Sequence, residues 1–330
     1  MSKSTRREVI KTGFAAGLGA IGAPYVVRAQ AAYPGSQTIK FVVPYPPAGA
    51  TDIVGRAVAD ALAAHWKTAT IVDNVPGAGG NIGMDRVAKG VADGTQLLII
   101  PPNITTNQFL YKSMPFNPES DIIAVSQVAG LANLLCVRKG LPVKNVAELI
   151  AYAKANPGKI NFASSGVGTT IHLSGEMFKK LAGLDIVHVA YRGSAPAVND
   201  MIAGHVDLMF DNLPSIEPQA RAGNVIGLAV TSKEKSSFAP SYPTVAETIP
   251  GFDVTSWFGI GLPAKTPQAI VDKLEADVIA VSKPGGDLAK RLAGQSIDVI
   301  GSSAKDFAAF VNKERKQWGD LITELKIKVE

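Results

Sequence analysis

Short apolar segments alternate with segments of helical periodicity along nearly the whole chain. The run Ile39-Lys-Phe-Val-Val43 has the length of a buried strand, and apolar residues recur at intervals of three and four through 52–65 directly after it. The strands expected from this pattern are 39–43, 69–73, 96–100, 122–128, 133–138, 160–163, 186–190, 206–210, 225–231 and 257–261. The helices expected are 52–65, 80–91, 103–111, 145–155, 171–182, 195–203, 215–222, 267–281, 286–293 and 304–325. This alternation predicts an α/β fold with largely parallel sheets.

Four junctions between an expected strand and the next helix consist of small residues. They are 47–51, 76–81, 164–170 and 193–196. In an open α/β sheet such loops lie beyond the carboxyl ends of the strands, where ligands bind. The first N–H groups of a helix have no partners within the helix, and small residues let a ligand reach them. The loops therefore predict an anion-binding cleft that needs little Arg or Lys, with ordinary tight turns as the alternative.

The first 31 residues have the pattern of an export signal. Lys3, Arg6, Arg7 and Lys11 precede a Gly/Ala-rich apolar segment, and Ala29-Gln30-Ala31 has the small-x-small form of a signal-peptidase site. Because Arg6 and Arg7 fit a twin-arginine leader, we expect a signal cleaved from 1–31 by that route and a soluble, periplasmic product. The alternatives are the general secretory route and a retained N-terminal anchor.

The excess of basic residues belongs mostly to that leader. The chain has 33 Lys and Arg and 28 Asp and Glu residues, and five of the former and one of the latter lie in 1–31. The remainder is almost neutral, so we expect no nucleic-acid partner and no binding to a membrane surface. Cys136 is the only cysteine and lies in an apolar run, which predicts a buried thiol and excludes an internal disulfide.

Motifs of enzymes and cofactor sites do not match the sequence. The glycines of 77–83 miss the dinucleotide-binding spacing, and neither a phosphate-binding loop nor a Gly-x-Ser-x-Gly elbow is present. The four histidines have no ligand spacing, so we expect no cofactor and no metal. His172 opens a helix after a Ser/Gly/Thr loop, where it faces either the cleft or the helix start. We therefore expect a protein that is not an enzyme, although a catalytic triad can assemble from distant positions.

Six segments in this order resemble a known family, the periplasmic solute receptors of tripartite tricarboxylate transporters, often called Bug receptors. The segments are 43–52 (VPYPPAGATD), 76–83 (PGAGGNIG), 162–168 (FASSGVG), 188–196 (HVAYRGSAP), 207–211 (DLMFD) and 257–263 (WFGIGLP). The resemblance covers essentially the whole chain after the leader. It implies a two-lobed periplasmic binding protein of type II, a Venus flytrap with crossover strands between its lobes.

The resemblance also implies the extent of the lobes and the partners. One lobe would comprise 36–130 and 255–330, and the other 131–254. The protein would be a monomer that delivers a small carboxylate to the membrane subunits of the transporter. Three residues depart from the family pattern: Ala48 replaces a frequent glycine, Val75 a frequent Arg or Lys, and Arg192 a common Lys.

The candidate residues for the ligand carboxylate come from two of the small-residue loops. The backbone N–H groups expected to face it are those of Gly49, Ala50 and Thr51. The residues expected to grip it from the other lobe are Ser165, Gly166 and Thr169. Thr170 would assist through its hydroxyl, or would cap the helix 171–182.

Further candidates carry charge or form the walls of the cleft. Arg192, beside Gly193 in the loop 193–196, is the best candidate for a distal carboxylate, with a surface salt bridge as the alternative. Asp52 either stabilises the start of its helix or contacts a ligand amine or hydroxyl. Asp211 follows a strand, where it would orient Arg192 or meet a ligand donor. Phe258 would wall the pocket.

Two other functions remain open from the sequence. A periplasmic enzyme acting on a carboxylated substrate would need a base or nucleophile in the same cleft. A ligand-sensing subunit for a sensor kinase would share the binding site and differ only in its partner. The ligand itself is open among di- and tricarboxylates, aromatic carboxylates and amino acids.

Overall fold

The computed structural model describes residues 33–328, so the predicted export signal lies outside the described residues. The strands are β1 (Ile39–Val43), β2 (Thr70–Asn74), β3 (Gln96–Ile100), β4 (Ile122–Arg138), β5 (Asn161–Ser164), β6 (Val187–Ala190), β7 (Leu208–Asn212), β8 (Val225–Val230), β9 (Thr255–Pro263) and β10 (Asp298–Val299). The helices are α1 (Ala50–Trp66), α2 (Asn81–Ala88), α3 (Asn107–Leu110), α4 (Val146–Ala155), α5 (Thr170–Ala182), α6 (Ser194–Ala203), α7 (Leu213–Arg221), α8 (Gln268–Val281), α9 (Asp287–Ala293) and α10 (Ala304–Leu325). Short 3₁₀ turns are η1 (Ala78–Gly80), η2 (Pro102–Thr105) and η3 (Val245–Glu247).

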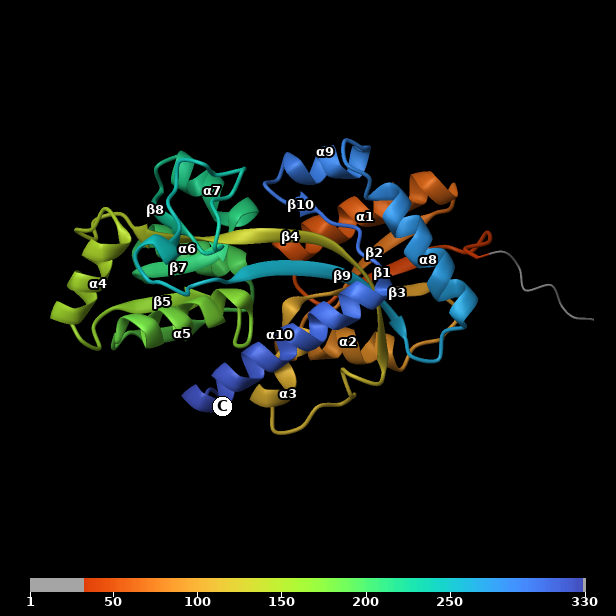
Figure 1. The fold of residues 1–330 in the computed structure, drawn as a ribbon, viewed down its shortest axis with the longest axis horizontal. Helices are drawn as coiled ribbons and strands as arrows, with labels where there is room; N and C mark the ends of the chain where they lie inside the picture. The colour runs from red at the N-terminus through yellow and green to blue at the C-terminus, as the bar shows by residue number, and fades with distance from the viewer. Residues whose placement is uncertain (1–32, 329–330) are drawn as a thin grey trace, which may run out of the picture. The chain divides into compact units, whose positions relative to one another are not determined.

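Two long strands connect the two halves of the strand arrangement. The strand order is β2-β1-β3-β9-β4-β7-β5-β6, and β10 and β8 also pair with β4. The first part of β4 pairs with β9 and β10, and its last residues, 133–138, pair with β7 and β8. Figure 1 shows β4 and β9 running side by side from the elements around β1 to those around β7.

The expectation of largely parallel sheets is correct for only part of the molecule. Strands β1, β2 and β3 are parallel to one another, as are β5, β6 and β7. Each of β3, β4 and β9 makes an antiparallel pair, because β4 and β9 return across the sheet instead of following a helical crossover.

Alternate side chains of the central strands enter different hydrophobic clusters. Phe41 of β1 and Leu97 of β3 pack with α1, α8 and α9, whereas Val42 and Leu98, the next residue of each strand, pack with α2 and α10. This alternation follows from the two-residue period of a strand. Helices therefore cover both faces, and continuous apolar runs such as 97–100 mark strands buried on each side.

The same arrangement recurs around β4 and β7. Leu135 and Phe210 enter one cluster, and Cys136 and Met209 enter another. Cys136 is fully buried, as predicted, and burial raises the pKa of its thiol well above the ordinary value. Among residues 33–328, no helix has the length and apolar character needed to cross a membrane.

Most expected elements agree with the structure to within about two residues at their ends, and two differ in kind. The strands expected at 122–128 and 133–138 are one continuous strand, β4, with irregular pairing near Ala124–Ser126 and Gln127–Ala129. The helix expected at 103–111 is divided into η2 and the short α3, since Thr106 separates them.

Candidate functional site

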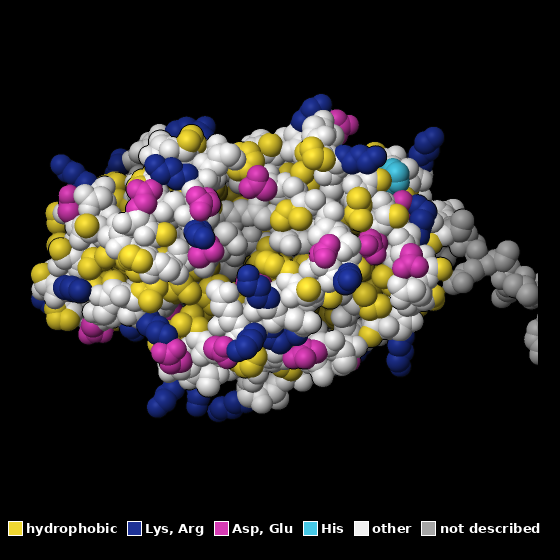
Figure 2. Space-filling view, in the orientation of Figure 1, with side chains coloured by type: hydrophobic (Ala, Val, Ile, Leu, Met, Phe, Trp, Pro, Cys, Tyr) yellow, Lys and Arg dark blue, Asp and Glu magenta, His cyan; other side chains and the backbone are white. Residues whose placement is uncertain are grey.

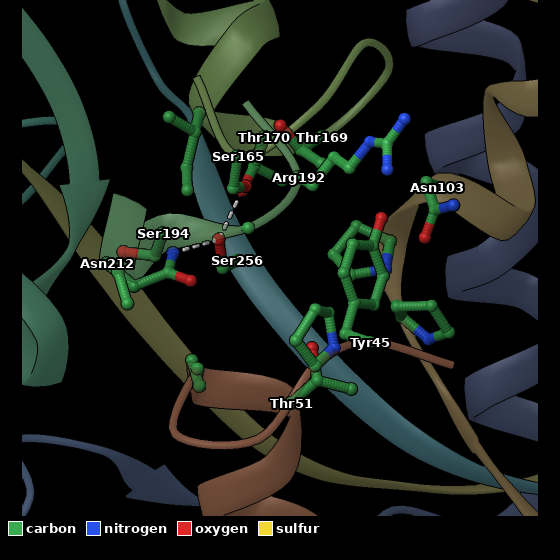
Figure 3. Close-up of a pocket in the computed structure, with 18 of the residues that line it drawn as sticks. Tyr45, Thr51, Asn103, Ser165, Thr169, Thr170, Arg192, Ser194, Asn212 and Ser256 are labelled. Carbon is green, nitrogen blue, oxygen red and sulfur yellow. Dashed lines mark hydrogen bonds between the residues drawn. The ribbon is translucent and has the colours of Figure 1, made fainter. Parts of the chain in front are cut away.

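A cavity of about 70 Å³ lies where three helices begin. It is bounded by the loops after β1, β3, β5 and β6, by the last residue of β7, and by residues near the start of β9. This is the carboxyl edge of the parallel strands, where open α/β sheets bind ligands. Figure 3 shows Thr51, Thr170, Asn212 and Ser256 around the open space, brought together from separate elements.

The beginnings of α1, α5 and α6 all line this cavity. Ala50 and Thr51 form the first turn of α1, Thr170 begins α5, and Ser194 and Ala195 begin α6. The early N–H groups of a helix have no intrahelical acceptors, and they lie at the positive end of its dipole. Three such ends around one small cavity make a site for an anion.

At two of these helix starts the N-cap residue is glycine, which has no side chain to bond the first N–H groups. Gly49 precedes α1 and Gly193 precedes α6, and neither helix has a side-chain cap. Gly193 has φ = 119°, a conformation that residues with a side chain rarely adopt. In α5 the cap is Thr169, whose Oγ1 accepts a hydrogen bond from His172 N at 3.3 Å. The prediction that Thr170 caps this helix is therefore wrong.

Thr170 instead belongs to a buried hydrogen-bond network. Its hydroxyl bonds Ser256 of β9, and Ser256 Oγ lies 2.7 Å from Asn212 Nδ2 and 3.1 Å from Asn133 Oδ1. These four residues are each less than a tenth exposed. The network joins the start of α5 to β4, β7 and β9 and fixes the inner wall of the cavity.

Asp52 supports the first loop and does not line the cavity. Its carboxylate accepts hydrogen bonds from Ala48 N at 3.0 Å, Arg56 Nε at 3.0 Å and Asn74 Nδ2 at 2.9 Å. Burial raises the pKa of Asp52, but the hydrogen bonds from Arg56, Asn74 and Ala48 outweigh burial and hold it below the ordinary value. The structure thus places this acid in the stabilising role at the helix start.

Arg192 is exposed and lines both the inner cavity and a larger neighbouring one. The second cavity measures about 500 Å³ and shares Tyr45, Pro46, Ser165, Arg192 and Gly193 with the first. The ion pairs found within 33–328 do not include Arg192. This guanidinium is placed where it can meet the outer part of a ligand, and the alternative of a surface salt bridge finds no partner in the described residues.

Asp211 is fully buried behind the cavity wall. It accepts hydrogen bonds from the Ser194 hydroxyl and from Asn212 N at 2.8 Å, and burial raises its pKa to about 6. Its hydrogen bonds do not include Arg192, so the expectation that it orients this arginine is not met. Asp211 instead holds Ser194, the first residue of α6.

His172 lies behind the loop 164–170 and not in the cleft. Its ring is 2% exposed, its Nδ1 accepts a hydrogen bond from Gly168 N at 3.2 Å, and its ring centre lies 4.1 Å from that of His188, with the two planes tilted by 35°. Burial lowers the pKa of both imidazoles, which are therefore neutral near pH 7. In residues 33–328 no cluster of three or more His, Cys, Asp or Glu side chains could hold a metal ion.

The structure brings most of the sequence candidates together. Those that line the inner cavity are Gly49, Ala50, Thr51, Ser165, Thr169, Thr170, Arg192, Gly193 and Phe258. Gly166 lines the neighbouring cavity, and Asp52 and Asp211 support the walls from behind.

Other lining residues were missed by the sequence reasoning. They include Tyr45, Asn103, Ser194, Asn212 and Ser256. The position of Asn212, directly after Asp211 at a strand end, was an available signal. Ser256 had none, because only the pairing of β9 with β4 brings it to the cavity.

Comparisons with known proteins find similar chains over most of the sequence. The family model described as "Tripartite tricarboxylate transporter family receptor" matches residues 54–327. The chain is 35% identical over 295 residues to the "UPF0065 protein in tcbD-tcbE intergenic region" of Pseudomonas sp. (strain P51), covering 88% of this chain and 87% of that protein.

Two solved structures carry ligands in their names. The structure of R. palustris Rpa4515 with adipate is 36% identical, with a TM-score of 0.86, and the match covers 90% of this chain and 100% of that one. MatC (Rpa3494) from Rhodopseudomonas palustris with bound malate is 28% identical, with a TM-score of 0.80, over 86% of this chain and 98% of that one. The likeness to these and other periplasmic binding proteins confirms the predicted two-lobed α/β binding-protein fold.

Proposed function

The chain belongs to the family of tripartite tricarboxylate transporter receptors, and on this basis we propose that it captures a small carboxylate in the inner cavity and delivers it to membrane subunits of such a transporter. We place this role in the periplasm, after cleavage of 1–31, with the receptor acting as a monomer. It is a binding role and not a catalytic one.

One observation carries the carboxylate assignment: three helix N-termini meet at one cavity of about 70 Å³. Of the residues that line this cavity, only Arg192 carries a charge. Backbone N–H groups can bind a carboxylate without help from a lysine or arginine side chain. Arg192 is then available to bind the outer end of the ligand. The adipate and malate in the names of two similar structures support this ligand class.

The number of donors is sufficient for useful affinity. A hydrogen bond to a charged group contributes about 1.5–3 kcal/mol. Micromolar binding needs about 8 kcal/mol. Four to six such contacts supply about 6–18 kcal/mol. The cost of ordering the ligand and closing the protein reduces this sum toward the value that micromolar binding needs.

We propose that closure occurs about β4 and β9, between a lobe of 36–130 and 255–330 and a lobe of 131–254. The first loop belongs to one lobe, and the loops after β5 and β6 belong to the other. A carboxylate that contacts all three helix starts then favours the closed state, because only that state supplies every donor.

The partner assignment follows from the family and from the surface. On the face in Figure 2, basic and acidic side chains are interspersed over the described residues. Such a surface supports a small-molecule ligand and a protein partner more than nucleic acid, which attracts a one-signed basic patch.

A thermal-shift screen tests this function. The chain is expressed with its own leader, purified from the periplasmic fraction, and refolded to remove any bound ligand. A carboxylate present at ~100 times its dissociation constant should stabilise it by about 2.7 kcal/mol. Stabilisation by one series of acids, and not by their uncharged amides, is the expected result. No stabilisation by any acid would contradict the proposal, and absence from the periplasm would contradict the location.

A further inference from the structure

The inner wall of the cavity presents an acceptor as well as the helix starts. Asn212, the last residue of β7, donates through Nδ2 to Asn133 Oδ1 at 2.5 Å and to Ser256 Oγ at 2.7 Å. Both hydrogens of this amide group are thereby used. The amide orientation is fixed, and Oδ1 is turned toward the open space, as Figure 3 shows for the labelled Asn212.

The neighbouring hydroxyls cannot donate to Asn212 or to a ligand. Ser256 has one hydrogen, and Asn133 Oδ1, 3.1 Å away, can only accept it. Thr170 must then donate its own hydrogen to Ser256, since only this arrangement satisfies every contact of Ser256. The side chains of this wall therefore offer the cavity lone pairs and no hydrogens.

Asn212 Oδ1 accepts no hydrogen bond from any described residue. A carboxylate oxygen placed against it would be repelled, whereas a ligand that covers this oxygen without donating to it removes its access to water and leaves it without a partner. The cavity is small, so Asn212 and the helix starts must meet the same end of the ligand. That end needs both a negative group and a hydrogen-bond donor.

The charges around the cavity decide which donor fits. An ammonium group would need a free carboxylate, but Asp52 and Asp211 lie behind the walls with their oxygens already bonded. The charged side chain that does line the cavity is Arg192, which repels an ammonium group. A neutral hydroxyl donates one hydrogen without this penalty.

We propose that the ligand is a hydroxycarboxylate whose hydroxyl, close to its carboxylate, donates to Asn212 Oδ1. This inference rests on the proposed carboxylate-binding function and deepens it: Asn212 selects for the hydroxyl, while the starts of α1, α5 and α6 bind the charge. An acid without the hydroxyl leaves the Asn212 oxygen unpaired or dependent on a trapped water.

Matched acids that differ in one hydroxyl test the proposal. The pairs are malate and succinate, lactate and propionate, and mandelate and phenylacetate, measured by titration calorimetry on the ligand-free protein. In at least one pair the hydroxy acid should bind about threefold to tenfold more tightly. In Asn212→Ala this ratio should fall to about one, mainly because the hydroxy acid loses affinity.

Ser174→Ala is the matched control, because Ser174 accepts from Asn133 Nδ2 at 3.3 Å at the far side of the network and does not line the cavity. It should keep the hydroxyl preference of the wild type. If Asn212→Ala does not fold, the wild-type ratios still decide the matter.

Three results would overturn the inference. Equal affinities within every pair would refute the role of Asn212 and leave carboxylate binding intact. Tighter binding of aspartate than of malate would assign the donor to an amine. Failure of every acid to bind would remove the proposed function itself, and with it this inference.

Discussion

At the scale of single residues, Ala48 stands out because it adopts φ = 70°, in the left-handed region. Its N–H donates to Asp52 Oδ2 at 3.0 Å, a contact that joins the first loop to the start of α1. An L-residue with a side chain loses about 1–2 kcal/mol in that region, and glycine does not. The resemblance noted above includes a frequent glycine at this position, so the chain carries a strained substitute.

We expect Ala48→Gly to stabilise the protein by about 0.5–1 kcal/mol, since relief of strain exceeds the entropy that glycine loses on folding. Urea denaturation measures the effect. The matched control is Ala64→Gly on the exposed side of α1, which should destabilise by up to about 1 kcal/mol. Equal losses in both variants would show that Ala48 is not strained.

Asp211 makes stability depend on pH. Its folded-state pKa is raised by burial from about 3.8 to about 6, so the folded protein holds a proton that the unfolded chain releases. Its contribution to stability is present below about pH 4 and is lost as pH rises toward 6. Asp211→Asn removes this loss.

The stability of Asp211→Asn relative to wild type should therefore increase by about 2–3 kcal/mol between pH 4 and pH 7. Urea denaturation at several pH values gives the difference. A constant difference across that range would mean that the carboxyl of Asp211 has an ordinary pKa in the folded protein.

At the scale of elements, β9 depends on a close approach to α10. A Cβ built on Gly259 would lie 2.2 Å from the Phe307 ring and 2.8 Å from Ser126 O. The backbone oxygen cannot move aside without disturbing β4. This is why the strand 257–263 carries glycine at a position that otherwise favours β-branched residues.

Gly259→Ala should destabilise the protein by about 1–3 kcal/mol through overpacking, as measured in urea. Gly294→Ala is the control: Gly294 has φ = −61°, and the nearest atom to its built Cβ is 3.5 Å away, so alanine should be tolerated. Similar effects at both sites would show that the contact with Phe307 does not limit β9.

Element positions were largely predictable because apolar periodicity is local. The division of 122–138 into two strands was wrong because Ala129-Gly-Leu-Ala132 lacks β-branched side chains, yet pairing with β9 continues through it. In the site, the small residues of 49–51, 165–170 and 193–196 were a usable signal. Ser256 carried no such signal, because contacts between residues more than 120 positions apart bring it to Asn133, and no local pattern encodes that contact.

At the scale of the whole molecule, we expect a change of shape on binding. The helix starts proposed to bind the carboxylate belong to both proposed lobes, and β4 and β9 connect them. Ligand should therefore lower the radius of gyration measured by small-angle X-ray scattering. An unchanged radius in the presence of a saturating acid would contradict closure, though not binding.

The central claim is that the starts of α1, α5 and α6 bind a carboxylate. The most direct test is calorimetric titration of the ligand-free protein with the strongest acid from the screen and with its neutral amide. We expect about micromolar binding of the acid and at least about a hundredfold weaker binding of the amide, because two or more charge-assisted hydrogen bonds are lost. Equal binding of the acid and the amide, or no binding of either, would contradict it.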